Sequence, residues 1–184
     1  MTTTLLIGTT GMLKAAAAHA VARSRKAVTL SRHAEDFSLG SDTLDVKLTR
    51  VSQSYDDGAA FLDVVARHAP YDLALTWIRP QAEILRAAID GMIAPGGRIV
   101  EVMGSRSILL GENGEASIAE RRAQALALQP DITYSQVILG FMLEGDGSRW
   151  LTHEEISAAT IAQMEKPQAR FVAGVLEPWE RRPK

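Results

Sequence analysis

Short apolar runs of strand length alternate with longer segments of helical periodicity along almost the whole chain. This alternation is typical of a parallel sheet covered on both faces by its crossover helices, because a strand buried on both sides is apolar throughout. The strands are expected at residues 4–8, 27–31, 46–52, 71–78, 98–103, 132–141 and 170–176. The pattern predicts a single doubly wound α/β domain over residues 1–184, with a mainly parallel, seven-stranded sheet.

Caps and chain breakers predict where the helices begin and end. Asp56-Asp57 is expected to cap a helix that ends near residue 68. Pro80 is expected to open the next helix, where a missing N–H is harmless, and Pro95-Gly96-Gly97 to stop it. Thr152 and Glu155 match a capping box. The remaining helices are expected at residues 12–23, 117–128 and 152–164.

Composition argues against several classes of function. The net charge is −2 and the charges are scattered, which favours neither nucleic acid nor a membrane surface as a partner. The N-terminus lacks the basic region of a signal peptide and no apolar run approaches ~20 residues, so we expect a cytoplasmic protein. The chain has no cysteine, and its four histidines share no ligand spacing. We therefore expect neither disulfides nor a metal site.

A glycine turn lies between the first predicted strand and the first predicted helix. It reads Gly8-Thr9-Thr10-Gly11-Met12-Leu13. A dinucleotide pyrophosphate binds backbone N–H groups at a helix N-terminus, and a side chain at the contact positions would keep it away. In this context the turn predicts a dinucleotide-binding Rossmann-type domain. Lys14 replaces the usual third glycine, so the small residues 15–18 are expected to permit close helix packing. The alternative is a tight turn that binds nothing.

The end of the second strand predicts which dinucleotide is bound. NAD-preferring domains place a carboxylate there for the ribose hydroxyl, but this chain has Ser31 and Arg32, with no acid before Glu35. A guanidinium and a hydroxyl suit a 2′-phosphate, so NADP(H) is predicted over NAD(H), the alternative being a solvated surface arginine. Gln53 and Trp77 complete the predicted cofactor-binding set, with a core position as the alternative for Trp77.

With these features the chain resembles the short-chain dehydrogenase/reductase superfamily. It is similar to small, atypical bacterial members in the glycine turn, in Gly147-Ser148-Arg149-Trp150-Leu151-Thr152 and in the tail Glu177-Pro178-Trp179-Glu180-Arg181-Arg182-Pro183. The resemblance covers nearly the whole chain. It implies a Rossmann fold, an NAD(P) cofactor and a small-molecule substrate. A homo-oligomer, dimer or tetramer, is also expected.

The chain departs from the superfamily at its catalytic residues. The superfamily uses a tyrosine and a lysine four residues apart on the helix after strand five, but residues 117–128 contain neither type. Ser105 stands where the superfamily has its catalytic serine, and Trp77-Ile78-Arg79 replaces the usual Asn-Ala-Gly. Ser105 and Arg79 are therefore the predicted catalytic residues, which would polarise the substrate.

Two functions remain open from the sequence. Ligands of open α/β sheets bind beyond the carboxyl ends of the strands, which selects Arg79, Ser105, Arg106 and residues 144–150, whereas Tyr134 is expected to point away. The first hypothesis is an NADPH-dependent reductase of a small carbonyl or imine compound. The alternative is a non-catalytic NADP(H)-binding redox sensor or regulatory protein. A methyltransferase is disfavoured by Ser31-Arg32, and a hydrolase or P-loop protein by the absence of their motifs.

Overall fold

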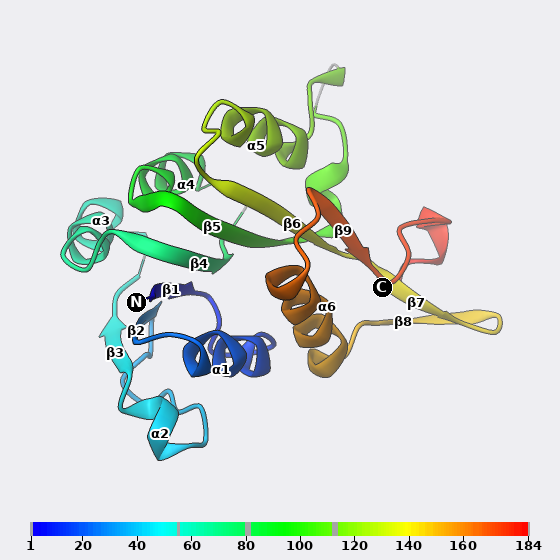
Figure 1. Ribbon diagram of the computed structural model, residues 1–184. Helices are drawn as coiled ribbons and strands as arrows, with labels where there is room; N and C mark the ends of the chain where they lie inside the picture. Colours follow the sequence, from blue (N-terminus) through cyan, green and yellow to red (C-terminus); the bar gives the residue numbers. More distant parts are fainter. Residues whose placement is uncertain (1, 55, 80–81, 112–113, 184) are drawn as a thin grey trace.

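Seven parallel strands form the centre of the protein, as the computed structural model of residues 2–54, 56–79, 82–111 and 114–183 shows (Figure 1). The order across the sheet is β3-β2-β1-β4-β5-β6-β9, and each neighbouring pair is parallel. The bounds are β1 Thr3–Ile7, β2 Lys26–Ser31, β3 Leu48–Ser52, β4 Tyr71–Trp77, β5 Ile93–Gly104, β6 Thr133–Leu139 and β9 Arg170–Ala173. The prediction of a doubly wound, Rossmann-type α/β fold is confirmed.

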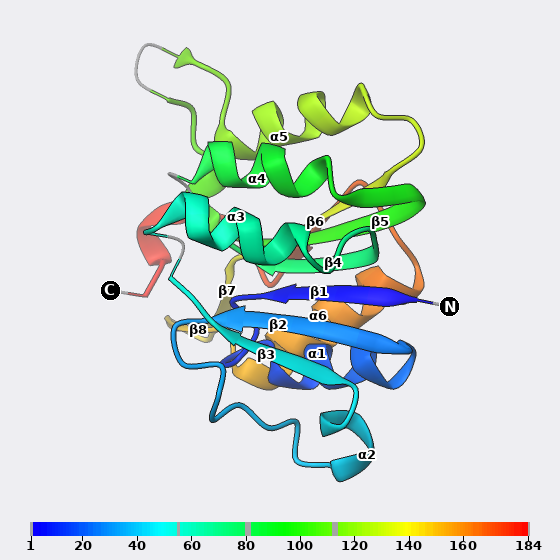
Figure 2. The same cartoon turned by 90° about the vertical axis from the view of Figure 1, so that its left-hand side faces the viewer.

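Helices cover both faces of this sheet. Helices α1 and α6 lie on one face, and α3, α4 and α5 lie on the other (Figures 1 and 2). The bounds are α1 Lys14–Ala22, α2 Asp42–Asp45, α3 Gly58–Ala66, α4 Glu83–Asp90, α5 Ile118–Ala127 and α6 His153–Glu165, with short 3-10 turns η1 at Ser105–Ile108 and η3 at Trp179–Arg181. Across the described part of the chain, no helix is both long and apolar enough to cross a membrane.

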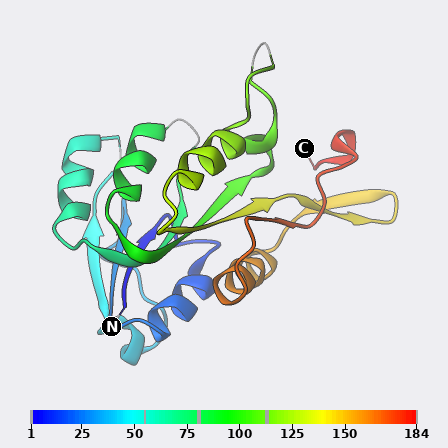
Figure 3. The ribbon, with the colours of Figure 1, turned by 45° about the horizontal axis from the view of Figure 1, so that its top comes forward.

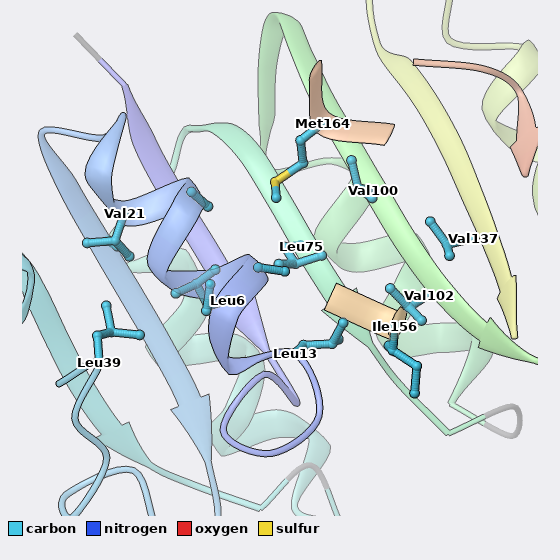
Figure 4. Close-up of a cluster of buried hydrophobic side chains, with 14 of the residues drawn as sticks. Leu6, Leu13, Val21, Leu39, Leu75, Val100, Val102, Val137, Ile156 and Met164 are labelled. Atoms are coloured by element: carbon cyan, nitrogen blue, oxygen red, sulfur yellow. The ribbon is translucent and has the colours of Figure 1, made fainter. Parts of the chain in front are cut away.

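Alternation along the strands builds one apolar core on each face. Leu6 of β1 packs with the α1 and α6 side chains, whereas Leu5 and Ile7 pack on the opposite face against α3 and α4. Figure 4 shows Leu6, Leu13 and Ile156 among the side chains of the first of these cores, with Leu13 next to Ile156. Successive residues of a strand point to opposite faces, so a strand covered on both sides must be apolar throughout. This is the reason why the apolar runs predicted the strands.

The caps predicted for two helices are confirmed. The Asp57 side chain accepts a hydrogen bond from the Ala60 N–H at 3.2 Å at the start of α3. At the start of α6 the Thr152 and Glu155 side chains each bind the other's backbone N–H, at 3.2 and 2.8 Å. Pro80 lies outside the described residues, and α4 begins at Glu83 with Ala82 as its N-cap, later than the start expected at Pro80.

The Pro95-Gly96-Gly97 stretch does not end a helix directly. Helix α4 ends at Asp90 with Gly91 as its cap, and β5 has already begun at Ile93. Pro95-Gly96-Gly97 instead lies inside β5, where the pairing with β4 shifts register. In the sequence, Pro and Gly at an irregularity inside a strand resemble the turn before a strand. This is the reason why the strand was expected to begin only after Gly97.

A β-hairpin that the sequence did not predict follows β6. The chain was expected to continue as one strand to residue 141 and then form a loop, but β6 ends at Leu139. Strands β7 (Phe141–Glu144) and β8 (Gly147–Trp150) pair antiparallel and project away from the sheet (Figure 3). The break occurs at Gly140, where a Cβ would lie 2.1 Å from the Val175 carbonyl oxygen. Strand β9 likewise ends at Ala173 rather than at residue 176.

A network of charged side chains is buried between β5 and the helices α4 and α5. Glu101 on β5 accepts hydrogen bonds from the Arg86 Nε at 2.6 Å and from the Arg122 Nε at 3.1 Å. Arg122 also forms a two-pronged pair with Asp90, at 2.7 and 3.0 Å. The Tyr134 hydroxyl donates to Glu101 at 2.9 Å. The two arginines balance the two carboxylates, so the buried cluster carries no net charge.

We predict that Glu101→Gln strongly destabilises the protein. The Glu101 side chain is 1% exposed, so its loss leaves two buried guanidinium groups with one carboxylate. Removal of one partner of a buried ion pair typically costs about 3–5 kcal/mol. Denaturant unfolding measures this change. The matched control is Glu83→Gln, which breaks the exposed pair with Arg121 and should leave the midpoint nearly unchanged. Equal midpoints for the two variants would contradict the prediction.

Candidate functional site

A cavity of about 340 Å³ opens beside the glycine turn, at the carboxyl ends of β1, β2, β3 and β4; we call it the turn cavity. Its lining comprises Ile7, Gly8, Thr10, Leu30, Ser31, Arg32, His33, Gln53, Ser54, Phe61, Trp77 and Arg79. These residues come from distant parts of the sequence, and parallel pairing brings them together because it aligns the carboxyl ends of the strands at one edge.

Six of the ten residues predicted to bind a cofactor line the turn cavity. They are Gly8, Thr10, Ser31, Arg32, Gln53 and Trp77. The other four, Thr9, Gly11, Met12 and Leu13, do not line it. Thr9 and Leu13 are fully buried as whole residues, so neither presents a surface to a ligand here.

The two glycines of the turn are required for different reasons. Gly8 has φ +68°, and a Cβ there would lie 2.3 Å from the Trp77 carbonyl oxygen, so the fold itself requires glycine. A Cβ at Gly11 would meet nothing within 4 Å. The fold therefore places no demand on Gly11, and a ligand that approaches the backbone would account for the glycine there.

Three features of the turn cavity fit a phosphate-bearing nucleotide. No side chain of a described residue caps the N-terminus of α1, where the helix dipole favours an anion, and the first N–H of the helix, that of Lys14, donates to the Gly11 carbonyl at 3.0 Å. The Ser31 hydroxyl is buried and has no hydrogen-bond partner among the described residues. The Arg32 side chain is exposed and forms no ion pair within the described chain. A 2′-phosphorylated ribose supplies acceptors for both side chains.

A second cavity, of about 460 Å³, lies beyond the ends of β4, β5 and β6, and we call it the apolar cavity. Its lining comprises Trp77, Ile78, Arg79, Arg86, Met103, Gly104, Ser105, Arg106, Ser107, Ile118, Leu139, Gly140, Trp150, Leu151, Ile156 and Arg182. Trp77 and Arg79 line both cavities, so the two spaces are neighbours. The volume lies within the usual range of small-molecule sites.

The Trp77 indole forms the boundary between the cavities. The residue is half-buried and packs against the core on the α1 and α6 face. Its Cβ lies near Gly8, and its ring reaches Gly104, where a Cβ would be 3.7 Å from the Trp77 Cη2. Trp77 therefore belongs both to the edge of the core and to the cavity walls. The core position expected as the alternative is therefore partly correct, and a role of Trp77 in cofactor binding stays a prediction.

The predicted catalytic residues, Ser105 and Arg79, both line the apolar cavity. Ser105 opens η1 directly after β5 and is buried. Arg79 follows β4, and its guanidinium lies 3.4 Å from the Asp56 carboxylate. Hydrogen bonds from the Arg86 guanidinium to the carbonyls of Ile78 and Arg79, at 2.6 and 2.8 Å, hold the backbone of this segment. Both side chains can donate to a ligand.

Other candidate residues have clear structural partners. Tyr134 lies outside the apolar cavity, and its pKa is raised by burial and by the Glu101 charge, so it is a poor proton donor. Arg149 pairs with Glu144 and with Glu155. Of the expected loop 144–150, Trp150 lines the apolar cavity. Within the described ranges, no group of three or more His, Asp and Glu side chains could hold a metal ion.

Sequence reasoning missed the contribution of the C-terminal tail. Arg182 lines the apolar cavity, and its guanidinium stacks over the Trp179 ring at 4.6 Å and the Trp150 ring at 5.9 Å. The tail is tied to the hairpin because the Arg181 side chain donates to the carbonyls of Gly145 and Gly147. The only signal in the sequence is a pair of tryptophans with arginines nearby, and it does not indicate a cavity wall.

Glu155 should make the stability of the cavity wall formed by the hairpin and the tail depend on pH in the acidic range. Its pKa is lowered to about 2 by hydrogen bonds from Arg149 of the hairpin and from the Thr152 N–H. A folded-state pKa below the unfolded value of 4.5 contributes stability above that value, which is lost as the pH falls from about 4.5 to about 2.

We therefore predict that Glu155→Gln loses less thermal stability than the parent chain over this acidic interval. Melting temperatures at pH values between about 2 and 6 measure the difference. Glu35→Gln, which removes an exposed carboxylate from the loop after β2, should follow the parent curve. Parallel curves for all three proteins would contradict the role given to Glu155.

Comparison with models of protein families and with curated proteins finds no match. Solved structures with the same fold include a short-chain dehydrogenase from Streptomyces avermitilis, 18% identical, TM-score 0.61, with 94% of this chain and 88% of that chain covered. BdcA in complex with NADPH is 16% identical, TM-score 0.61, with 96% of each chain covered. A metagenomic short-chain oxidoreductase in complex with NADP is 15% identical, TM-score 0.59, with 95% of each chain covered. At these identities the likeness is one of fold.

Proposed function

We propose that the chain is a short-chain dehydrogenase/reductase-like protein that binds NADP(H) and reduces a small carbonyl or imine compound. The observation that carries the proposal is the adjacency of the two cavities at the carboxyl edge of the sheet, with Trp77 and Arg79 in both linings. A dinucleotide has two halves, and such a pair of spaces suits a cofactor that ends beside its substrate. Fold neighbours that hold NADPH and NADP support the choice of cofactor.

In this proposal the turn cavity and the start of α1 that follows the glycine turn bind different parts of the cofactor. The N-terminus of α1 and Gly11 receive the pyrophosphate, and Ser31 and Arg32 receive the 2′-phosphate. The bound cofactor supplies the hydride. Ser105 and Arg79 line the neighbouring cavity, where they donate hydrogen bonds to the oxygen or nitrogen on which negative charge develops.

A non-catalytic NADP(H)-binding sensor is the second candidate. It is favoured by the lining of the apolar cavity, in which the described residues include no tyrosine, lysine, histidine or carboxylate. A sensor would leave NADPH unconsumed with a panel of aldehydes, ketones, quinones and imines, and would change its oligomeric state when NADPH is added. We propose that the protein forms a homo-oligomer in either case.

We predict that Arg32→Ala weakens the binding of NADPH far more than that of NADH. The variant loses a charge-assisted contact to the 2′-phosphate, which NADH lacks, so the affinity for NADPH should fall about tenfold. Isothermal calorimetry with both cofactors measures the change. Arg67→Ala, which removes an exposed arginine directly after α3 that lines neither of the two cavities, serves as the control. Equal losses for NADPH and NADH would refute the assignment of Arg32.

Gly11→Val tests the pyrophosphate position separately from folding. Because a side chain at Gly11 meets no neighbour, the variant should unfold at nearly the parent midpoint. It should nevertheless lose dinucleotide binding, since the branched side chain blocks the approach to the helix N-terminus. Normal NADPH binding by the folded variant would show that the cofactor sits elsewhere.

We predict that Ser105→Ala lowers turnover while NADPH affinity stays nearly unchanged. Loss of a donor to developing charge reduces kcat by a factor on the order of ten to a thousand. The measurement is NADPH oxidation with the best substrate of the panel, beside Ser41→Ala, a serine that lines neither cavity, as the control. If turnover is unchanged in both Ser105→Ala and Arg79→Ala, the protein is an enzyme but these two residues are not its catalytic residues.

A further inference from the structure

The described lining of the apolar cavity contains four arginines and no carboxylate. Two of the four are compensated by acids: Arg86 by the buried Glu101, and Arg79 by Asp56. The other two, Arg106 and Arg182, have no carboxylate partner within the described chain. The cavity therefore presents uncompensated positive charge.

Arg182 is held in place by aromatic rings. Its guanidinium lies over the rings of Trp179 and Trp150, at 4.6 and 5.9 Å. Stacking engages the face of the guanidinium plane, whereas the N–H donors point outward along its edge. A stacked arginine without a carboxylate is thus oriented and still able to bind an anion in two-pronged geometry.

Arg106 and Ser107 also line the apolar cavity, from the 3-10 turn after β5. The Arg106 side chain is exposed and forms no hydrogen bond or ion pair with described residues. The Ser107 hydroxyl is buried and has no hydrogen-bond partner within the described chain. An unpartnered buried hydroxyl is unfavourable unless a ligand or water supplies its hydrogen bond.

Apolar side chains form the rest of the lining, among them Met103, Leu139, Trp150 and Ile156. Such a surface favours an apolar ligand body of small-molecule size. The charged group of that ligand must lie near the guanidinium groups, because an unpaired anion is unfavourable among apolar side chains.

We infer that the apolar cavity binds a hydrophobic carboxylate. Its apolar body packs against the Met103, Leu139 and Ile156 side chains, and its carboxylate is bound by Arg106 and Arg182. This inference rests on the proposed function where it makes the compound the substrate: the reducible carbonyl or imine belongs to a hydrophobic molecule that also carries an acid.

Two probes of matched shape test the charge requirement. 2-Naphthoate and its neutral analogue 2-naphthamide are titrated into the full chain, with tryptophan fluorescence as the readout because Trp77 and Trp150 line the cavity. We expect 2-naphthoate to bind at least tenfold more tightly. Arg106→Gln and Arg182→Gln should each weaken the binding of 2-naphthoate three- to tenfold and leave that of 2-naphthamide unchanged. Arg67→Gln, on the surface of α3, should affect neither.

The titrations are repeated at saturating NADPH. Retained binding of 2-naphthoate supports the inference, whereas competition would overturn it, because the arginines would then serve the cofactor. Equal affinity for the two probes, or equal losses for both in the arginine variants, would also overturn it. If NADPH does not bind but the arginine-dependent preference for 2-naphthoate persists, the proposed function fails and the carboxylate site stands. If Arg182→Gln loosens the tail and so disturbs the cavity, the binding measured with Arg106→Gln, which lies outside the tail, still decides the test.

Discussion

Glu101 is a carboxylate enclosed between the sheet and two helices, and the geometry of both cavities depends on how its charge is compensated. A single buried carboxylate is strongly unfavourable, so the fold must bring donors to it. Arg86 from α4, Arg122 from α5 and Tyr134 from β6 all reach it. Burial opposes the charge of Arg122, but hydrogen bonds and charges from Asp90 and Glu101 hold its pKa above the usual value.

This network connects the interior to the site through Arg86. The same guanidinium that binds Glu101 also donates to the backbone carbonyls of Ile78 and Arg79. Those two residues follow β4, at the boundary between the turn cavity and the apolar cavity. The backbone position and the local charge at the boundary between the cavities are thus set by the interaction of Arg86 with Glu101, which lies beneath the surface of the site. A hydrogen-bonded arginine of this kind keeps a short segment rigid where apolar packing alone would not.

The sequence was sufficient to predict the sheet and the turn cavity, because both follow from local patterns. A strand buried on both faces is apolar throughout, and parallel strands share one carboxyl edge, so Gly8, Ser31 and Gln53 had to converge. The buried network was not predictable in the same way. Arg86, Asp90 and Arg122 lie on helices that also carry surface charges, and nothing local distinguishes an inward arginine from a solvated one. Glu101 within an apolar strand was the one available signal.

The walls of the apolar cavity were the least predictable part. They depend on contacts between segments far apart in the sequence: Arg182 of the tail stacks on Trp150 of the hairpin, and the hairpin is joined to α6 through Arg149 and Glu155. Periodicity has no bearing on such contacts. The chain leaves β6 at Gly140, where a Cβ would lie 2.1 Å from the Val175 carbonyl oxygen, so this break requires glycine.

The contrast between Gly8 and Gly11 determines how the glycine turn will change during evolution. Gly8 is constrained by the Trp77 carbonyl, so it will persist in any descendant that keeps this fold, whether or not that descendant binds a nucleotide. Gly11 has no such constraint from the fold, and under the proposed function only the bound pyrophosphate would keep a glycine there. Under that proposal, the residue at position 11 across related chains would report whether binding is retained, and a shared glycine at position 8 would report only common architecture.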